Sequence, residues 1–252
     1  MTNLAPTRRV PEPTVGFWVL KVLTTGVGEV ASDFFVKTFD PVVVVLVAAV
    51  AFAGVAAVQL TARGYVPWRY WLFVFAVAVF GTMIADVAHL VVGIPYAVTT
   101  AGFAIVLLAI FVVWRRREGT LSVHSIDTNR REIFYWLTVC ATFALGTAFG
   151  DFTATTLGLG FLVSGLVFLA LFAIPGGLRL LGIPGTATFW WAYIMTRPLG
   201  ASFADWLALP PERGGLDLGY LPIVAIGTAL IAIGVVILQV RVTQVRRSPQ
   251  SS

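Results

Sequence analysis

The chain alternates between long apolar stretches and short polar ones, and the apolar stretches have the length of membrane-crossing helices. A transmembrane helix needs about 20 mostly apolar residues. The odd-numbered stretches also carry charged residues, whereas the even-numbered ones are almost purely aliphatic, small or phenylalanine. The pattern predicts an all-α polytopic membrane protein with eight transmembrane helices, at about 15–36, 41–61, 69–92, 95–114, 132–155, 157–177, 187–208 and 219–241.

The odd-numbered stretches repeat one arrangement of tryptophan, glycine and aspartate. A tryptophan stands fifteen residues before each aspartate, a glycine stands five residues before it, and an aromatic residue precedes each tryptophan. This spacing indicates four parallel two-helix repeats, each expected to form a helical hairpin, at about 15–61, 69–114, 132–177 and 187–241. Residues 1–14 and 242–252 are expected to be cytoplasmic tails around one membrane domain, 15–241. The repeated positions are Phe17, Trp18, Gly28 and Asp33; Tyr70, Trp71, Gly81 and Asp86; Tyr135, Trp136, Gly146 and Asp151; and Phe189, Trp190, Gly200 and Asp205.

Two helices and one tryptophan per repeat, in four tandem copies, resemble a bacterial membrane-protein family known as a repeat of unknown function. The resemblance covers about residues 15–241 and implies the fold, but it brings no biochemical activity. The segments that carry it are Lys21…Thr24-Thr25-Gly26-Val27-Gly28-Glu29…Asp33, Gly81-Thr82…Asp86, Gly146-Thr147-Ala148…Gly150-Asp151 and Thr196-Arg197-Pro198-Leu199-Gly200-Ala201…Asp205.

Composition and charge agree with a membrane protein. Hydrophobic residues make up 58% of the chain and charged residues 12%, against about 25% charged in soluble domains. The net charge of +5 does not indicate nucleic-acid binding, because thirteen Lys and Arg residues fall on one side of the predicted membrane and only Lys37 and Arg213 on the other. Since basic loops stay in the cytoplasm, both termini are expected there, in a bacterial inner membrane. The single cysteine, Cys140, excludes an intrachain disulfide.

Polar side chains fall on equivalent faces of the four odd-numbered helices when successive residues are placed 100° apart around the helix axis. They are expected to face a common interior, with the glycine near mid-membrane and the aspartate about 22 Å from the tryptophan at 1.5 Å per residue. The candidate ion- or substrate-binding residues are Lys21, Thr25, Glu29, Asp33, Thr82, Asp86, Thr147, Asp151, Arg197 and Asp205.

Each of these features also has a purely structural interpretation. The glycines at 28, 81, 146 and 200 are expected to allow close helix packing, and the tryptophans are expected to be interfacial anchors. Lys21 with Glu29, and Arg197 with an aspartate of another repeat, could be structural ion pairs. However, five acids against two bases inside the membrane leave charge that water, protons or a cation must compensate.

The preferred hypothesis is a transporter for a cation, with Glu29 and Asp33 as tentative ligands of a divalent metal, since carboxylates suit manganese, magnesium or calcium. Proton exchange on the same carboxylates would give antiport. The alternatives are a non-catalytic sensor or assembly protein, and a carrier of an organic or anionic solute bound by Lys21 and Arg197. A membrane-embedded enzyme that uses paired carboxylates as general acid and base is disfavoured, because the sequence has no nucleophile motif, no glycine-rich phosphate loop and no His/Cys metal cluster. No enzymatic activity and no cofactor are therefore expected. The expected partners are the lipid bilayer and a small ion or solute, without nucleic acid; a homo-oligomer remains open.

Overall fold

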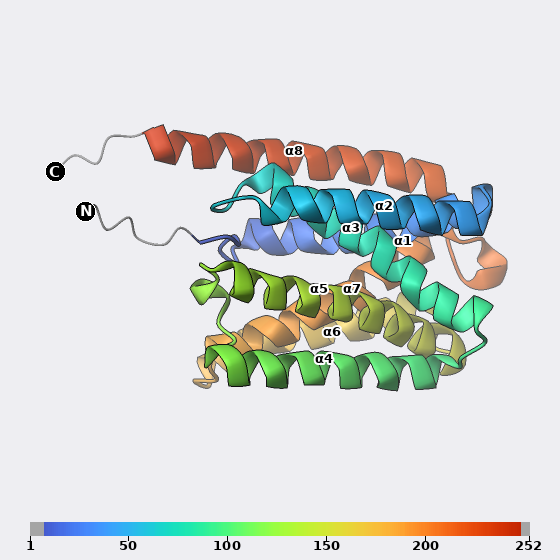
Figure 1. Ribbon diagram of the computed structural model, residues 1–252. Coiled ribbons are helices and arrows are strands. Elements are labelled where there is room, and N and C mark those ends of the chain that lie inside the picture. The colour runs from blue at the N-terminus through green and yellow to red at the C-terminus, as the bar shows by residue number, and fades with distance from the viewer. Residues whose placement is uncertain (1–7, 248–252) are drawn as a thin grey trace, which may run out of the picture.

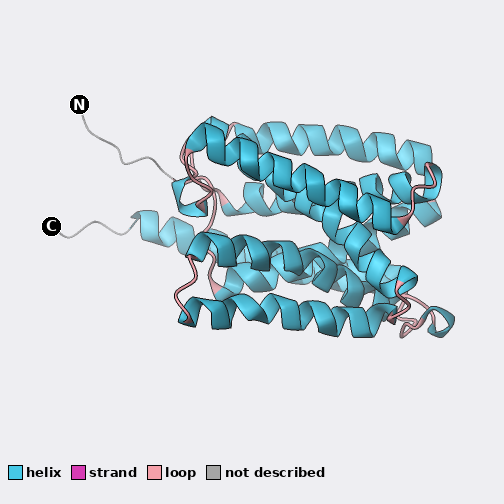
Figure 2. Ribbon diagram, turned by 90° about the horizontal axis from the view of Figure 1, so that it is seen from below, coloured by secondary structure: helices cyan, strands magenta, loops and turns pink. Residues whose placement is uncertain are grey.

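The computed structural model describes residues 8–247, and within them eight α-helices run back and forth between the two ends of one bundle (Figure 1). Turns and short 3₁₀ or π-helical segments connect them at the two ends (Figure 2). The helices are α1 (Val15–Thr38), α2 (Pro41–Leu60), α3 (Pro67–Asp86), α4 (Tyr96–Glu118), α5 (Asn129–Asp151), α6 (Gly160–Leu180), α7 (Gly185–Ala208) and α8 (Tyr220–Arg247).

Six of these helices are long and apolar enough to cross a membrane: α2, α3, α4, α5, α6 and α8. The other two, α1 and α7, have 24 residues each, about 36 Å at 1.5 Å per residue, and lie within the same bundle. Lys21, Glu29 and Arg197 lower their hydropathy while remaining buried. The chain is therefore a polytopic membrane protein, as predicted.

Local signals in the sequence set many of the helix ends. The Thr14 side chain accepts a hydrogen bond from the Phe17 backbone N–H and caps α1, as threonine does at helix starts. Asp40 caps α2 in the same way, with Pro41 at the first helical position. At the end of α4, Gly119 adopts φ 72°, a left-handed conformation that glycine takes at little cost.

Several boundaries differ from those predicted. Helix α8 continues to Arg247, so residues 242–247 extend a helix where a tail was expected. The start of α5 is also earlier, at Asn129, because Thr128 caps it. Residues 1–7 and 248–252 of the predicted tails lie outside the described residues.

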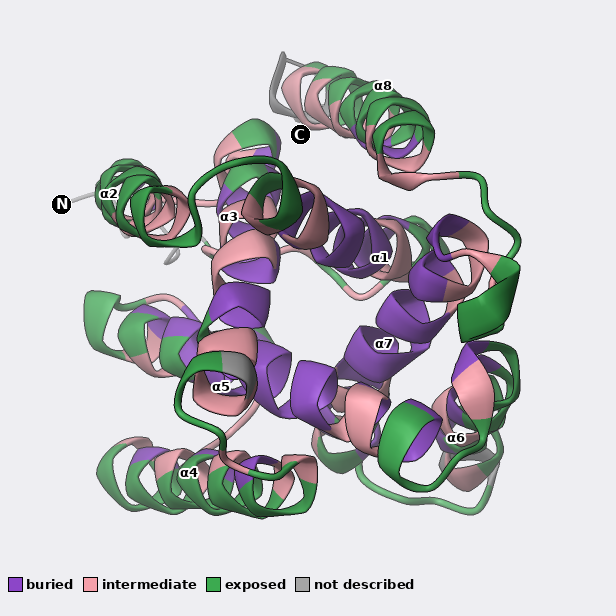
Figure 3. Ribbon diagram, turned by 90° about the vertical axis from the view of Figure 1, so that its right-hand side faces the viewer, coloured by how far each residue is buried: buried purple, intermediate pink, exposed green. Residues whose placement is uncertain are grey.

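The four odd-numbered helices form an inner ring, and the even-numbered helices lie outside it (Figure 3). Within the ring α1 contacts α3, α3 contacts α5, α5 contacts α7, and α7 contacts α1. Buried positions concentrate on these four helices, whereas α2, α4 and α8 are mostly exposed (Figure 3). Exposed apolar side chains on the outer helices suit a lipid environment.

The predicted hairpin packing is not what the structure has. Each outer helix packs mainly against the inner helix of the next repeat: α2 against α3, α4 against α5, α6 against α7, and α8 against α1 (Figure 3). Helices α1 and α2 are neighbours in sequence but make few contacts with each other. The outer set of helices is therefore completed by α8 of the fourth repeat, which covers α1 of the first.

The four repeated glycines lie at the four successive contacts of the ring. A Cβ added at Gly28 would overlap Ala78 of α3, and one added at Gly81 would lie 2.9 Å from the Cβ of Phe143 in α5. A Cβ at Gly146 would overlap the Arg197 side chain of α7, and one at Gly200 would overlap Thr25 of α1. Each glycine thus lets its helix approach the next one closely.

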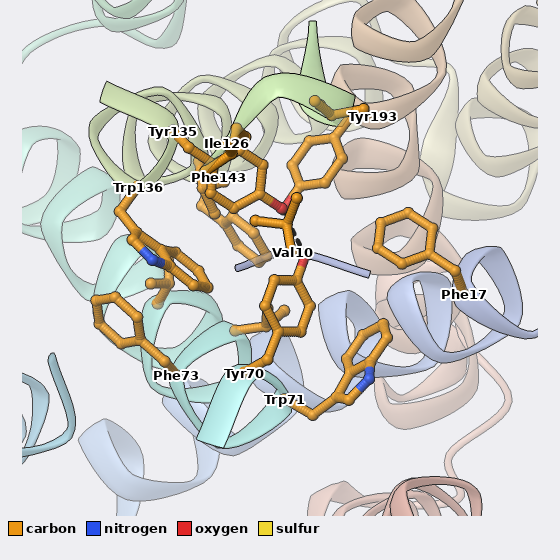
Figure 4. Close-up of a cluster of buried hydrophobic side chains, with 14 of the residues drawn as sticks. Val10, Phe17, Tyr70, Trp71, Phe73, Ile126, Tyr135, Trp136, Phe143 and Tyr193 are labelled. Carbon is orange, nitrogen blue, oxygen red and sulfur yellow. Dashed lines mark hydrogen bonds between the residues drawn. The ribbon is translucent and has the colours of Figure 1, made fainter. Parts of the chain in front are cut away.

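The repeated aromatic residues close the N-terminal end of the ring (Figure 4). Each tryptophan packs against the aromatic residue of the preceding repeat, and the fourth repeat returns to the first. The ring-centroid distances are 5.7 Å for Trp71–Phe17, 5.3 Å for Trp136–Tyr70, 6.0 Å for Trp190–Tyr135 and 5.5 Å for Trp18–Phe189. Such pairs are worth about 0.5–1.5 kcal/mol each beyond their burial.

The interpretation of the tryptophans as interfacial anchors is wrong for three of the four. Trp71, Trp136 and Trp190 are 1%, 4% and 4% exposed, so their surfaces are turned to other aromatic rings of the protein. Trp18 is partly exposed. The repeated tryptophan therefore joins one repeat to the next.

Two segments cover this aromatic end and form what we call the lid, residues 8–14 and 119–128. Val10 and Ile126 are buried against the aromatic rings (Figure 4), and the Arg9 N–H donates to the Ile126 carbonyl at 3.0 Å. Arg9 also forms an ion pair at 2.6 Å with Glu132, a fully buried carboxylate that accepts a bond from Gln59 at 2.9 Å. Part of the predicted N-terminal tail is thus packed structure.

Candidate functional site

The centre of the inner ring is occupied by the guanidinium of Arg197, which is fully buried. The residue lies in α7 directly before Pro198, and its side chain crosses α5 where Gly146 leaves room for it. Any larger residue at position 146 would collide with the Arg197 side chain. The repeated glycine of the third repeat therefore also shapes the polar site.

Every other inner helix offers an acceptor to this guanidinium. Its Nη2 donates to the Glu29 carboxylate of α1, to the Thr82 hydroxyl of α3, and to the Thr147 hydroxyl of α5 at 2.7 Å. Its Nη1 donates to the Thr25 carbonyl at 3.2 Å. Glu29, Thr82 and Thr147 occupy the same repeat position, which the sequence placed on equivalent faces. The four repeats thus meet at one polar cluster, which we call the arginine layer: Glu29, Thr82, Thr147 and Arg197.

The hydroxyls of the arginine layer are themselves well bonded. Thr82 Oγ1 lies 3.0 Å from Glu29 Oε2 and 2.9 Å from the Ala78 carbonyl, so its proton can go to either oxygen. Thr147 donates to the Phe143 carbonyl at 3.2 Å. A buried ion pair is stable only when its remaining hydrogen-bonding atoms are satisfied, and the two threonines contribute to this.

Thr25 joins α1 to α7 beside the arginine layer. Its hydroxyl lies 2.7 Å from the Val22 carbonyl and 3.1 Å from the Thr196 carbonyl. Because both neighbours are backbone acceptors and Gly200 lies against the same hydroxyl, the structure gives Thr25 a packing and positioning role here.

Lys21 lies fully buried on the lid side of the arginine layer. Its Nζ is 4.1 Å from the centroid of the Phe143 ring and 4.4 Å from that of the Tyr193 ring. Among the described residues this ammonium has no hydrogen-bond acceptor. Aromatic faces attract a cation through their quadrupole, so two rings from α5 and α7 replace the carboxylate that Lys21 would otherwise need.

The four repeated aspartates lie on the side of the arginine layer that faces away from the lid. We call them the aspartate layer: Asp33, Asp86, Asp151 and Asp205. Asp33 is paired with Lys37 at 2.5 Å, and Lys37 also donates to the Tyr220 hydroxyl at 2.6 Å. The other three carboxylates have no ion pair within residues 8–247. Each interacts electrostatically with Glu29, Asp33 and Arg197, so the four inner helices do turn their aspartates towards one region.

Two of these aspartates stand at a change in helix geometry. Asp86 directly precedes the π-helical turn Val87–Val91, and Asp151 directly precedes the π-helical turn Phe152–Thr156. In the first and fourth repeats the α-helix continues past Asp33 and Asp205. Single π-helical turns often occur at functional sites. Here they follow two aspartates that are partly exposed and that have no ion pair in the described part of the chain.

The structure does not bring Glu29 and Asp33 to one ion. Glu29 is bound to Arg197 and Asp33 to Lys37, so each carboxylate has its own cationic partner. Within the described residues no three His, Cys, Asp or Glu side chains gather as a metal site. Arg197 also pairs with a glutamate, where an aspartate partner was considered from the sequence.

Sequence reasoning missed the polar residues between the arginine layer and the lid. Tyr70, Tyr135 and Tyr193 point towards one another (Figure 4), with a 2.5 Å bond between the Tyr70 and Tyr135 hydroxyls. Tyr70 and Tyr135 were noticed only as aromatic residues preceding a tryptophan. Their hydroxyls, absent from Phe17 and Phe189 at the same repeat position, were the signal that could have identified them.

Comparisons with known proteins agree with the repeat architecture. The model of a family described as Repeat of Unknown Function (DUF347) matches four times in tandem, at residues 16–65, 69–120, 134–181 and 188–244. No curated protein and no solved structure matches the chain. Since the four matches cover most of the sequence and coincide with the four structural repeats, the chain belongs to the DUF347 repeat family.

Proposed function

We propose that the protein is a membrane transporter that moves a cation through the centre of its four-helix ring. The observation that carries this proposal is the convergence of all four repeats on the arginine layer, beside three aspartates that have no ion pair among the described residues. A network that only held helices together would need no more acids than bases. Ionisable groups inside membrane helices are costly and usually mark ion pathways.

The charge balance favours a cation as the transported species. Arg197 neutralises Glu29, and Lys37 neutralises Asp33. Lys21 lies against aromatic rings on the lid side of the arginine layer, so its charge does not neutralise the aspartate layer. The negative charges of Asp86, Asp151 and Asp205 must therefore be balanced by another positive charge, which we propose is the transported cation. Carboxylates and threonine hydroxyls are hard oxygen ligands that suit manganese, magnesium and calcium. The π-helical turns after Asp86 and Asp151 offer adjustable backbone for such an ion.

The proposed location is a bacterial inner membrane with the lid in the cytoplasm. The lid, the α2–α3 connection and the end of α8 lie at one end of the bundle (Figure 1). The arginines at 115, 116, 117, 130 and 131 flank the lid segment 119–128. An excess of basic residues of this kind retains loops in the cytoplasm.

Reconstitution into liposomes tests the proposal directly. Uptake of Mn²⁺, Mg²⁺ and Ca²⁺ would be measured for the wild type and for an Asp86→Asn, Asp151→Asn double variant, which keeps side-chain shape and removes two charges. The wild type is expected to take up at least one of these cations and the double variant none. Single Asp86→Asn and Asp151→Asn variants are expected to slow uptake, because each removes one carboxylate that lacks an ion pair.

The matched control is Asp217→Asn, which removes an exposed carboxylate from the α7–α8 connection. It is expected to transport at the wild-type rate. All variants would be compared at equal reconstituted amounts after size-exclusion chromatography shows a folded protein. Wild-type uptake in the Asp86→Asn, Asp151→Asn variant would refute the carboxylate pathway and leave a packing role for the cluster.

A further inference from the structure

The contact between α1 and α7 has a groove on its outer side. The two helices touch at Gly26 and Gly200, where a Cβ added at Gly26 would lie 2.8 Å from the Gly200 carbonyl oxygen. Glycines allow this close approach and leave no side chain to fill the space outside it. Helix α6 covers α7 and α8 covers α1, on either side of the contact, and α8 makes few contacts with α7 (Figure 3). We call this depression along α1 and α7 the seam groove.

Two cavities follow one another along the seam groove. The first, of about 580 Å³, lies at the lid end, between the lid, Trp18 of α1, the end of α6 and the start of α7. The second, of about 620 Å³, begins one helical turn further along α1, at Val22, and is enclosed by α1, α7 and α8. Trp18 and Val27, which lines the second cavity, are about 14 Å apart along the helix axis. Half of a hydrocarbon core of about 30 Å has the same depth, so the groove is long enough for a lipid chain of one leaflet.

The polarity of the seam groove changes along its length as that of a phospholipid does. The first cavity is lined in part by the polar side chains of Ser122, His124, Thr186 and Thr188. Gly185 and Thr186 begin α7, whose first backbone N–H groups have no side-chain cap, and such groups bind phosphate. Among the described residues, those that line the second cavity are all apolar. A polar head at the lid end and an apolar chain beyond it therefore match the two cavities.

Aromatic rings form the wall between the polar end of the groove and its apolar part. Trp18 packs on Phe172 of α6 and on Phe189 of α7, with ring centroids 5.7 Å and 5.5 Å apart, and all three rings line the first cavity. Pro175 inside α6 also lines this cavity, and a proline in a helix interior bends the helix. Trp18 is the repeated tryptophan that is partly exposed. It thus has the interfacial position that tryptophan favours beside lipid head groups.

The charges near the first cavity favour an anionic lipid. The Glu12 carboxylate, next to Pro13 of the cavity wall, is paired with Arg8 and lies 3.3 Å from His124, so its charge is neutralised. Basic segments at a membrane surface attract anionic lipids. Five further positive charges flank the lid segment 119–128, on Arg115, Arg116, Arg117, Arg130 and Arg131.

We propose that the seam groove binds one anionic phospholipid of the leaflet on the lid side. Its head group lies among the polar groups of the first cavity, and one acyl chain lies in the second. The walls come from α1 of the first repeat and from α7 and α8 of the fourth, so the lipid fastens the last repeat to the first. The site lies outside the ring and does not depend on the proposed transport function.

The test measures the lipid that full-length protein retains in native mass spectrometry, after extraction from liposomes of equal parts phosphatidylglycerol and phosphatidylcholine. Gly176→Leu fills the first cavity, because Gly176 lines it and no heavy atom lies within 4 Å of a Cβ added there. Gly177→Leu is the matched control, since its Cβ has the same free space but the residue does not line the cavity. For the second cavity, Ile226→Trp is compared with Ile233→Trp. Both are exposed residues of α8, and of the two Ile226 lines the cavity.

The wild type is expected to retain one phosphatidylglycerol molecule per protein, and the two control variants the same amount. In Gly176→Leu and in Ile226→Trp, retention should fall about tenfold, which corresponds to about 1.4 kcal/mol of binding free energy. All variants would be compared as folded protein after size-exclusion chromatography. Equal retention within either matched pair, no retained lipid in the wild type, or equal retention of phosphatidylcholine would overturn the inference. A lipid-free dimer joined at the groove would overturn it as well. Since transport is not measured, none of these outcomes bears on the proposed function.

Discussion

Arg197 is the residue on which the four repeats depend most directly, because its partners come from the three other inner helices. The sequence placed Glu29, Thr82 and Thr147 on equivalent faces, and all three now contact its guanidinium. Which acid it binds could not be predicted, since a helical wheel gives a direction around the axis but not how far a long side chain reaches along it. The tyrosine hydroxyls were missed for a related reason: tyrosine and phenylalanine occupy the same repeat position.

The Arg197–Glu29 pair should show strong energetic coupling. Arg197→Ala leaves a buried carboxylate without its cation, which costs about 3–5 kcal/mol in comparable buried pairs. Glu29→Gln is expected to cost less in the Arg197→Ala background than in the wild type, with a coupling of about 1–3 kcal/mol. Unfolding of the detergent-solubilised protein in a double-mutant cycle measures this. Additive effects would mean that the two side chains do not stabilise each other.

At the scale of helices, the close contacts of the ring follow from glycines that the sequence already marked. Glycine spacing predicted close packing, and each repeated glycine lies at a ring contact. The π-helical turns after Asp86 and Asp151 could not be predicted, because all four repeats have the same spacing up to the aspartate and only tertiary packing distinguishes them beyond it.

Two glycine substitutions should therefore have opposite effects on stability. Gly102→Ala in α4 adds a methyl group where no atom lies within 4 Å, so it should stabilise the helix by about 0.5–1 kcal/mol. Gly81→Ala places a Cβ 2.9 Å from that of Phe143, and overpacking of this kind typically costs about 1–3 kcal/mol. Thermal unfolding in detergent compares the two. Equal shifts of the melting temperature would contradict the close α3–α5 contact.

At the scale of the whole molecule, the number of helices and the repeat boundaries were predictable, but their packing was not. Hydropathy and the tryptophan–aspartate spacing give eight helices in four pairs. They do not predict which inner helix an apolar outer helix packs against, because apolar side chains are distributed almost evenly around the axis of the outer helix. In the structure each outer helix packs against the inner helix of the next repeat. Residues 8–14, which composition alone suggested were solvent-exposed, form part of the lid and pack on the aromatic end of the ring.

The orientation of the molecule gives a further prediction. In a background with Cys140 replaced by alanine, Glu212→Cys should react with a membrane-impermeant maleimide added to intact cells, and Arg116→Cys should react only after the membrane is permeabilised. Both positions are exposed and lie at opposite ends of the bundle. We expect the lid end, where Arg116 lies, to be cytoplasmic because basic residues surround the lid. The reverse labelling pattern would place the lid outside the cytoplasm.

The displacement of each outer helix onto the next repeat bears on how such a chain can arise by gene duplication. A peptide with one repeat would bury little surface within itself and would gain its packing from other copies. Four copies around an axis normal to the membrane would reproduce the contacts of α2 with α3 and of α8 with α1. Such a homotetramer would carry the same residue at every equivalent position. Fusion into one chain removes that restriction, and only then can a single Glu29 of α1 pair with a single Arg197 of the neighbouring α7.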